Sequence, residues 1–222
     1  ARVSVVGTGI DVEVFSGSGP AADADYPYLI YAGTMSEVHG ASVFVEAFGQ
    51  VAQKHPTARL LMFGQGVELD SLKARAAEVA PGRIDFRGVV AGEEIARWIR
   101  SAHAGLASVR PGRGYDFAYA TKTFVTVSCG TPVIYSGVGP ARALVEENQL
   151  GWAADWVADD VAHAMADALD TPPNRQARER LSQWASQNHS LDSVGRRAAA
   201  AVDRIASESG PVDLKRREDQ RG

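Results

Sequence analysis

Short apolar segments alternate with longer amphipathic segments along most of the chain, and this alternation is the strongest constraint on its fold. The short segments have the composition of buried strands and cover residues 28–32, 58–63, 83–86, 104–109 and 132–135. The longer segments have the apolar period of helices and cover residues 43–51, 69–79, 95–99, 121–129, 141–147, 157–169 and 191–206. The sequence therefore predicts an α/β fold, a doubly wound parallel sheet with helices on both faces.

Composition and charge restrict the kinds of partner. The 222 residues are 45% hydrophobic and 23% charged, as in an ordinary globular protein. Lys and Arg number 23 against 27 Asp and Glu, so the formal net charge is -4 and no basic field attracts a phosphate backbone. We therefore expect no nucleic acid as a partner. No apolar run approaches the roughly 18 residues of a membrane-spanning helix, and association with a membrane surface is left open.

The chain has a single cysteine, Cys129, and therefore forms no internal disulfide. A protein without disulfides is typical of a reducing compartment. The first six residues, ARVSVV, lack the shape of a secretory signal. These observations predict a cytoplasmic protein.

Changes of composition near both ends indicate three regions. Residues 16–25 are small, acidic and rich in glycine, which indicates that residues 1–25 form an interdomain segment and linker. Residues 26–206 carry the alternating pattern and form the main domain. Residues 207–222 mix charges with almost no apolar side chains, which predicts a flexible charged tail.

Three glycine-rich loops follow expected strands and are candidates for ligand binding. Ligands of doubly wound sheets bind at the carboxyl ends of the strands, where loops 33–40, 112–121 and 137–140 are expected. Glycine lets backbone N–H groups approach a phosphate, and the positive end of a helix favours an anion. None of the loops has a GxGxxG or P-loop motif, so turn formation alone is the alternative explanation.

The segment ATKTFVTVSCGTPVI, residues 120–134, carries a more specific signal. It resembles the P-(S/T)-K-x-(F/Y)-E-x-x-A-x-G-x-P-V-I motif in the carboxyl-terminal half of GT-B glycosyltransferases of the retaining group 1 family. Further segments that resemble motifs of this family follow one another in the family's order, at residues 5–15, 30–48, 86–88 and 137–152. The likeness extends over residues 1–206.

The resemblance implies a Rossmann-like donor domain, the C-terminal half of a GT-B fold. Such a domain binds a nucleotide diphosphate sugar, and the whole enzyme transfers the glycosyl group with retention at the anomeric carbon. The resemblance also implies that an N-terminal acceptor domain precedes Ala1, so that this chain alone is an incomplete catalyst. It implies no cofactor and no obligatory metal, because helix dipoles and cations stabilise the leaving diphosphate.

Lys122 is the strongest candidate for contact with the donor diphosphate. It stands at the start of an expected helix, where the backbone of Ala118, Tyr119 and Thr121 can add N–H donors. A cation is locally unfavourable at a helix start, and its presence there favours a function. The alternative is a solvated lysine on the helix surface.

Four positions depart from the family pattern. Thr34 and His39 stand where the family has an arginine and a lysine on the diphosphate, and a histidine that charges near neutral pH replaces a lysine only in part. Phe117 and Val125 stand where the family has the glutamates of an E-x7-E motif, of which the second accepts hydrogen bonds from the nucleotide ribose. Val125 cannot accept a hydrogen bond, so either a neighbour compensates or the donor binds differently.

Other side chains near these positions complete the candidate site, although each is equally explained as a loop residue. Asp116 can reach a sugar hydroxyl, Tyr115 can stack on a sugar or base, and two arginines can replace the missing cations. No catalytic residue and no metal ligand is assigned. The expected substrate-binding residues are Gly33, Thr34, His39, Arg110, Arg113, Tyr115, Asp116, Ala118, Tyr119, Thr121, Lys122, Gly137 and Gly139.

A second hypothesis is a degenerate, non-catalytic GT-B-like module that keeps the fold in order to dock a partner. The absence of both glutamates and of two diphosphate cations favours it. The charge of Lys122 separates the two hypotheses, because only donor binding requires it.

Overall fold

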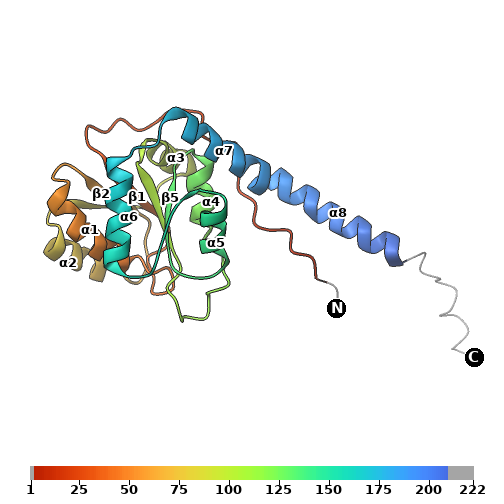
Figure 1. The fold of residues 1–222 in the computed structure, drawn as a ribbon, viewed down its shortest axis with the longest axis horizontal. Coiled ribbons are helices and arrows are strands. Elements are labelled where there is room, and N and C mark those ends of the chain that lie inside the picture. Colours follow the sequence, from red (N-terminus) through yellow and green to blue (C-terminus); the bar gives the residue numbers. More distant parts are fainter. Residues whose placement is uncertain (1–2, 210–222) are drawn as a thin grey trace, which may run out of the picture.

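A computed structural model describes residues 3–209 of the chain (Figure 1). Its centre is one parallel sheet, in which the strand order is β3-β2-β1-β4-β5-β6. The strands are β1 (Tyr28–Ala32), β2 (Arg59–Phe63), β3 (Ile84–Gly88), β4 (Ala104–Ser108), β5 (Val133–Ser136) and β6 (Gly151–Ala154). The order reverses beside β1, which is the topological switch point of a doubly wound fold. The predicted fold class is confirmed.

Helices cover both faces of the sheet. They are α1 (Ser42–Lys54), α2 (Leu69–Val79), α3 (Gly92–Ser101), α4 (Thr121–Ser128), α5 (Pro140–Glu147), α6 (Ala158–Asp170), α7 (Arg175–His189) and α8 (Leu191–Ser209). One face packs against α1, α2 and α6, and the other packs against α3, α4, α5 and α7 (Figure 1).

The alternation of side chains in β1 explains why this strand is apolar throughout. Leu29 and Tyr31 belong to the core cluster under α1, α2 and α6, whereas Tyr28 and Ile30 belong to the cluster under α3. All four side chains are buried. A parallel strand that is covered on both faces needs apolar residues at successive positions, and this requirement produces the continuous run in the sequence.

Two elements were not delimited from the sequence. Strand β6 has only four residues, begins with Gly151 and is partly exposed, so its apolar signal is weak. Helix α7 has few apolar residues and is held in part by a half-buried arginine, Arg178. The Arg178 guanidinium donates to the carbonyl oxygens of Arg100 at 2.8 Å and Ala102 at 2.9 Å. Polar contacts of this kind leave no hydrophobic pattern along the chain.

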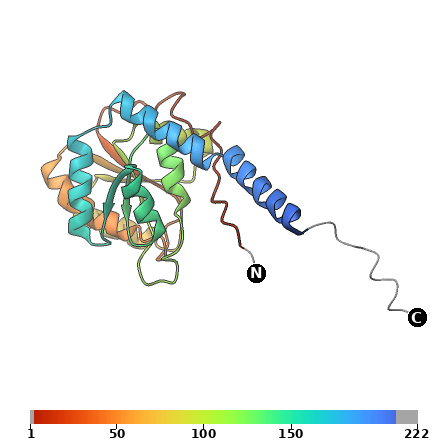
Figure 2. The ribbon, with the colours of Figure 1, turned by 45° about the vertical axis from the view of Figure 1, so that its right-hand side comes forward.

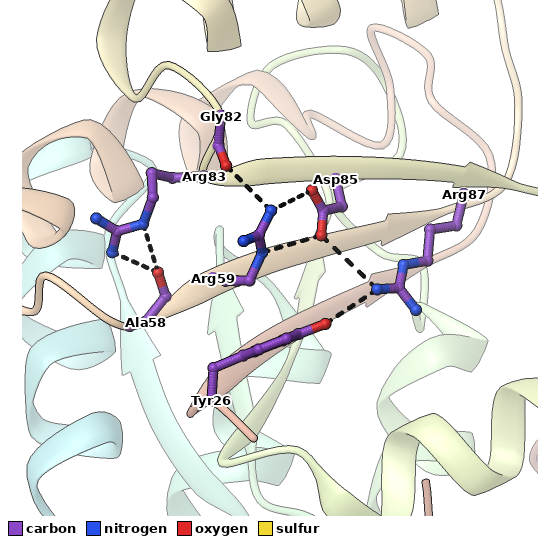
Figure 3. A network of polar contacts seen from close by, with 7 residues as sticks. All are labelled: Tyr26, Ala58, Arg59, Gly82, Arg83, Asp85 and Arg87. Atoms are coloured by element: carbon purple, nitrogen blue, oxygen red, sulfur yellow. Dashed lines mark hydrogen bonds and ion pairs between the residues drawn. The ribbon is translucent and has the colours of Figure 1, made fainter. Parts of the chain in front are cut away.

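A polar network joins β3, the strand at one edge of the sheet, to its neighbours (Figure 3). The Arg59 guanidinium donates to both Asp85 carboxylate oxygens, at 2.8 and 3.1 Å. Arg87 donates to the Tyr26 hydroxyl at 3.1 Å and lies 3.7 Å from the Asp85 carboxylate. Charged side chains on an edge strand also discourage pairing with another chain.

The segment before β1 contacts α7 and α8 from Val6 onward, through hydrogen bonds of Val6 with Arg197 and of Thr8 with His189. Ile10 forms a bridge with Ser190, and the Arg100 guanidinium donates to the carbonyl oxygens of Val14, Ser16 and Pro20. The boundary at residue 25 stays a prediction.

Helix α8 continues the chain away from the sheet, and its far end projects from the domain (Figures 1 and 2). The expected tail began at residue 207, but α8 runs to Ser209, so the first three residues of that segment are helical. Residues 210–222, the rest of the expected tail, lie outside the described part of the chain. Over residues 3–209, no helix has the length and apolar character needed to span a bilayer.

Candidate functional site

A cavity of about 720 Å³ opens at the carboxyl ends of β1, β2, β3 and β4. Its walls come from the loops after these strands and from the first turns of α4. This is the position at which a doubly wound sheet binds ligands. Eight of the thirteen expected binding residues line the cavity, namely Gly33, Thr34, His39, Tyr115, Ala118, Tyr119, Thr121 and Lys122.

The ammonium group of Lys122 is the principal charge in this cavity. Its Nζ atom lies 3.2 Å from the Tyr31 hydroxyl and 4.7 Å from the centre of the Tyr31 ring. The Tyr31 hydroxyl in turn donates to the carbonyl oxygen of Thr34 at 2.6 Å. Among residues 3–209, no carboxylate forms an ion pair with Lys122. Burial of the ammonium lowers the pKa of Lys122 to about 8, because the surrounding protein replaces its water.

An ammonium group that is held in a cavity wall without a carboxylate partner is suited to an anionic ligand. Removing a charge from water is costly unless an opposite charge compensates for it. A bound anion supplies that compensation, and the Tyr31 hydroxyl and ring hold the lysine in place until it arrives.

The start of α4 adds backbone donors beside Lys122. Thr121 and Lys122 occupy the first two positions of the helix, and Ala120, which precedes them, makes no side-chain cap. The first N–H groups of a helix have no partner within the helix and carry the positive end of its dipole. The N–H group of Ala118, expected to donate to the diphosphate, instead donates to the carbonyl oxygen of Tyr115 at 2.8 Å.

Gly33 provides space for Lys122 and not a phosphate-binding N–H group. Its N–H group already donates to the carbonyl oxygen of Phe63 at 3.0 Å. Its φ of 152° suits glycine, and a Cβ atom there would lie 2.9 Å from the Lys122 Cε atom. The glycine therefore allows the lysine side chain to pass along the backbone toward the cavity.

His39 lies in the cavity wall but is a poor substitute for a cation. Its Nδ1 atom is 2.8 Å from the Ser36 hydroxyl, and its carbonyl oxygen accepts a hydrogen bond from the Ser108 hydroxyl. Burial, with a smaller effect of the Lys122 charge, lowers the pKa of His39 below its usual value. The lowered pKa disfavours the charged ring, so His39 is a weaker replacement for the family's lysine than the sequence alone suggests.

Arg110 and Arg113 lie outside the cavity lining. Both guanidinium groups form ion pairs with the Glu37 carboxylate. The distance from the Arg110 Nη1 atom to the Glu37 Oε1 atom is 3.1 Å. Arg110 also stacks 4.9 Å from the centre of the Trp156 ring system. Sequence reasoning could not foresee these partners, because Glu37 and Trp156 come from loops distant in the chain.

The loop before α4 presents aromatic side chains at the mouth of the cavity. Tyr115 and Tyr119 line the cavity and are 50% and 45% exposed. Phe117 is 75% exposed, lies outside the lining and stacks on Tyr115, with ring centres 6.5 Å apart. The Asp116 carboxylate accepts a hydrogen bond from the N–H group of Gly112 and also lies outside the lining.

Gly137 and Gly139 lie in the loop after β5, which contacts the loop before α4 outside the cavity lining. The N–H group of Gly137 donates to the carbonyl oxygen of Ala154 at 3.2 Å. A Cβ atom on Gly139 would lie 1.8 Å from the carbonyl oxygen of Asp116, so the two backbones are in direct contact. Neither glycine lines the cavity, and their role as substrate contacts stays a prediction.

The apolar half of the cavity was not assigned from the sequence. Its side chains come from the segment before β1, the loop after β3, and helices α3 and α4. The signals that pointed to it were the FRG segment at 86–88 and the rule that ligands bind at strand ends. The missed lining residues include Phe15, Phe63, Gln65, Val89, Val90, Ile95, Ile99 and Val125.

Comparisons with known proteins agree with this fold and identify the family. Residues 26–171 match the family model described as "Glycosyl transferases group 1". A curated relative, the D-inositol 3-phosphate glycosyltransferase of Frankia alni, is 27% identical over 167 residues, which are 68% of this chain and 40% of that protein. A second enzyme of the same name, from Paenarthrobacter aurescens, is 27% identical over 82% of this chain and 46% of that protein. The chain thus spans less than half the length of these relatives.

Solved structures share the fold at low sequence identity. Sucrose-phosphate synthase from Thermosynechococcus elongatus superposes with a TM-score of 0.76 at 20% identity, over 90% of this chain and 52% of that one. Anabaena HepE, solved in complex with UDP-glucose, superposes with a TM-score of 0.69 at 16% identity, over 88% of this chain and 56% of that one.

Proposed function

Since this chain belongs to the group 1 glycosyl transferases, we propose that its cavity binds a nucleotide diphosphate sugar as the donor for glycosyl transfer. One observation carries the proposal, namely the half-buried Lys122 ammonium in the cavity wall, which has no carboxylate partner among residues 3–209. The UDP-glucose in the structure of Anabaena HepE, which has the same fold, is a ligand of the proposed class. An acceptor domain outside this chain completes the proposed enzyme.

The proposed chemistry follows from the position of this charge. In the transfer, the bond between the anomeric carbon and the diphosphate oxygen breaks, the oxygen of an acceptor hydroxyl bonds to that carbon with retention of configuration, and the hydroxyl proton passes to the leaving diphosphate. Negative charge then collects on the leaving diphosphate. The Lys122 ammonium and the free N–H groups at the start of α4 stabilise that charge where it develops. We propose that these groups make a resident metal unnecessary.

The proposal is tested by titrating the full chain with uridine, guanosine, adenosine and thymidine diphosphates and with their common sugars. Calorimetry is expected to show micromolar binding for at least one base. Folded protein that binds no member of this panel would contradict donor binding and favour the docking module.

The binding of a nucleotide sugar is also expected to take up protons near pH 8. The pKa of Lys122 is lowered to about 8, so about half of these side chains are neutral at that pH. The bound diphosphate favours the charged ammonium, raises this pKa and draws about half a proton from the buffer. Below pH 7 the lysine is already charged and the uptake disappears, whereas above pH 9 the affinity falls.

Calorimetric titration in two buffers of different ionisation enthalpy measures this uptake. A nucleotide sugar is the suitable probe, because its diphosphate has no group that ionises near pH 8. The same heat of binding in both buffers at pH 8 would show that Lys122 does not change its protonation.

A further inference from the structure

The cavity lining contains a cation but no carboxylate. Lys122 and His39 are its only ionisable nitrogen-containing side chains, and no Asp or Glu is among the described residues that line it. On the side of α4 beyond Lys122, the wall is formed by Val125. This side chain packs with Phe15, Val90 and Ile95 against the core cluster under α3. A ligand group on that side therefore meets aliphatic and aromatic carbon.

Helix geometry determines which part of the ligand meets Val125. Lys122 and Val125 are three residues apart on α4, so they share a helix face and are separated by about 4.5 Å along its axis. Both line the cavity. If the diphosphate of a nucleotide contacts Lys122, the next group along the molecule is the pentose. A nucleotide that extends along α4 from Lys122 would therefore place its pentose against Val125.

The neighbouring polar side chain on α4 does not replace the missing acceptor. Thr126 also lines the cavity, but it is only 5% exposed. A Cβ atom on Gly105 in β4 would lie 2.5 Å from the Thr126 Cγ2 atom and 2.7 Å from its Oγ1 atom. The hydroxyl is thus packed against the β4 backbone, which limits its reach toward a ligand beside Val125.

We propose that this site prefers 2′-deoxyribonucleoside diphosphates to their ribonucleoside counterparts, with Val125 as the specificity-determining residue. The inference rests on the proposed function, because the pentose is placed by the diphosphate on Lys122. A ribose brings a 2′-hydroxyl to a wall that cannot accept its hydrogen bond, and a polar group buried without a partner weakens binding. A deoxyribose brings a C–H group, which packs on the valine at no such cost.

Matched nucleotide pairs test this preference on the full chain. UDP and dUDP, or ADP and dADP, differ by one oxygen atom, so the ratio of their dissociation constants cancels every contact of base and phosphate. Calorimetry is expected to give a dissociation constant about tenfold lower for the deoxy member of the pair. Equal affinities, or tighter binding of the ribonucleotide, would overturn the inference.

Two variants of Val125 sharpen the test. Val125→Glu adds a carboxylate that accepts from ribose hydroxyls, and it is expected to shift the ratio about tenfold toward the ribonucleotide. Val125→Met has a side chain of similar length without an acceptor and is expected to keep the deoxy preference. An unchanged ratio in folded Val125→Glu would assign the preference elsewhere and overturn the role of Val125. If Val125→Glu does not fold, the wild-type and Val125→Met ratios still decide the preference.

The failure of this inference is distinguishable from the failure of the proposed function. Nucleotides that bind without a preference for deoxyribose leave donor binding intact and overturn only the inference. Folded protein that binds none of the nucleotides overturns both.

Discussion

Replacement of Lys122 by alanine is expected to weaken nucleoside diphosphate binding about 100-fold. The substitution removes the one ammonium group in the described cavity lining, and no arginine is among the described residues that line the cavity. Loss of a charged hydrogen bond to a phosphate in a partly buried site costs about 3 kcal/mol, which corresponds to this factor. Calorimetric titration with the nucleotide that binds the wild-type chain measures the change.

The matched control is Lys73→Ala. Lys73 is an exposed residue of α2 and does not line the cavity, so its replacement is expected to leave the dissociation constant unchanged. Comparable losses in both variants would indicate a general effect of net charge and contradict a specific contact. Circular dichroism verifies that Lys122→Ala keeps its helices, because the alanine also removes the contact with the Tyr31 ring.

Replacement of Gly64 by alanine is expected to lower the free energy of unfolding by about 3 kcal/mol. Gly64 has a φ of 126°, and a Cβ atom there would lie 2.0 Å from the carbonyl oxygen of Gly33. The loops after β1 and β2 are therefore in contact backbone to backbone, and neither can withdraw without breaking hydrogen bonds such as that from Gly33 to Phe63. Denaturation by urea, followed by circular dichroism, measures the loss.

Gly82→Ala separates the clash from the strain of the backbone. Gly82 also has a positive φ, 70°, but nothing lies within 4 Å of the position that its Cβ atom would take. Its replacement is expected to cost only about 1 kcal/mol, the usual penalty of a left-handed conformation for an L-residue. Equal losses at both positions would show that the contact between the two loops contributes nothing.

Gly64→Ala is also expected to weaken nucleotide binding in the fraction that folds. Gly33 lies between Gly64 and the Lys122 side chain, so a displaced Gly33 backbone moves toward the lysine. Binding would then be affected although Gly64 carries no charge and no side chain. Unaltered affinity in the folded variant would show that the Lys122 position is independent of this loop.

Most strands and helices could be delimited from the sequence, but β6 and α7 could not. The buried strands β1 and β2 are continuous apolar runs because both faces of the sheet are covered. Strand β6 lies at an edge and is partly exposed, so it carries no comparable run. Arg178 holds α7 by polar contacts with the carbonyl oxygens of Arg100 and Ala102, which no hydrophobic period reveals.

The candidate site was likewise predictable only where a residue's role depends on its local sequence. Lys122 was identified from its place at the start of a helix after a glycine-rich loop, and the structure places it in the cavity wall. The interactions of the other candidate residues depend on side chains that are distant in the chain. Glu37 forms ion pairs with Arg110 and Arg113 outside the cavity lining, and burial within the protein lowers the pKa of His39.

The sequence by itself determined the α/β class, the order of most elements and the strand ends at which the cavity lies, because these follow from local periodicity and from the geometry of parallel sheets. Only the tertiary structure decided which of the candidate charges is available. A charge is available when no opposite charge from another part of the chain lies beside it, and this depends on how distant loops pack. By that criterion Lys122 is left for a ligand, and Arg110 and Arg113 are not.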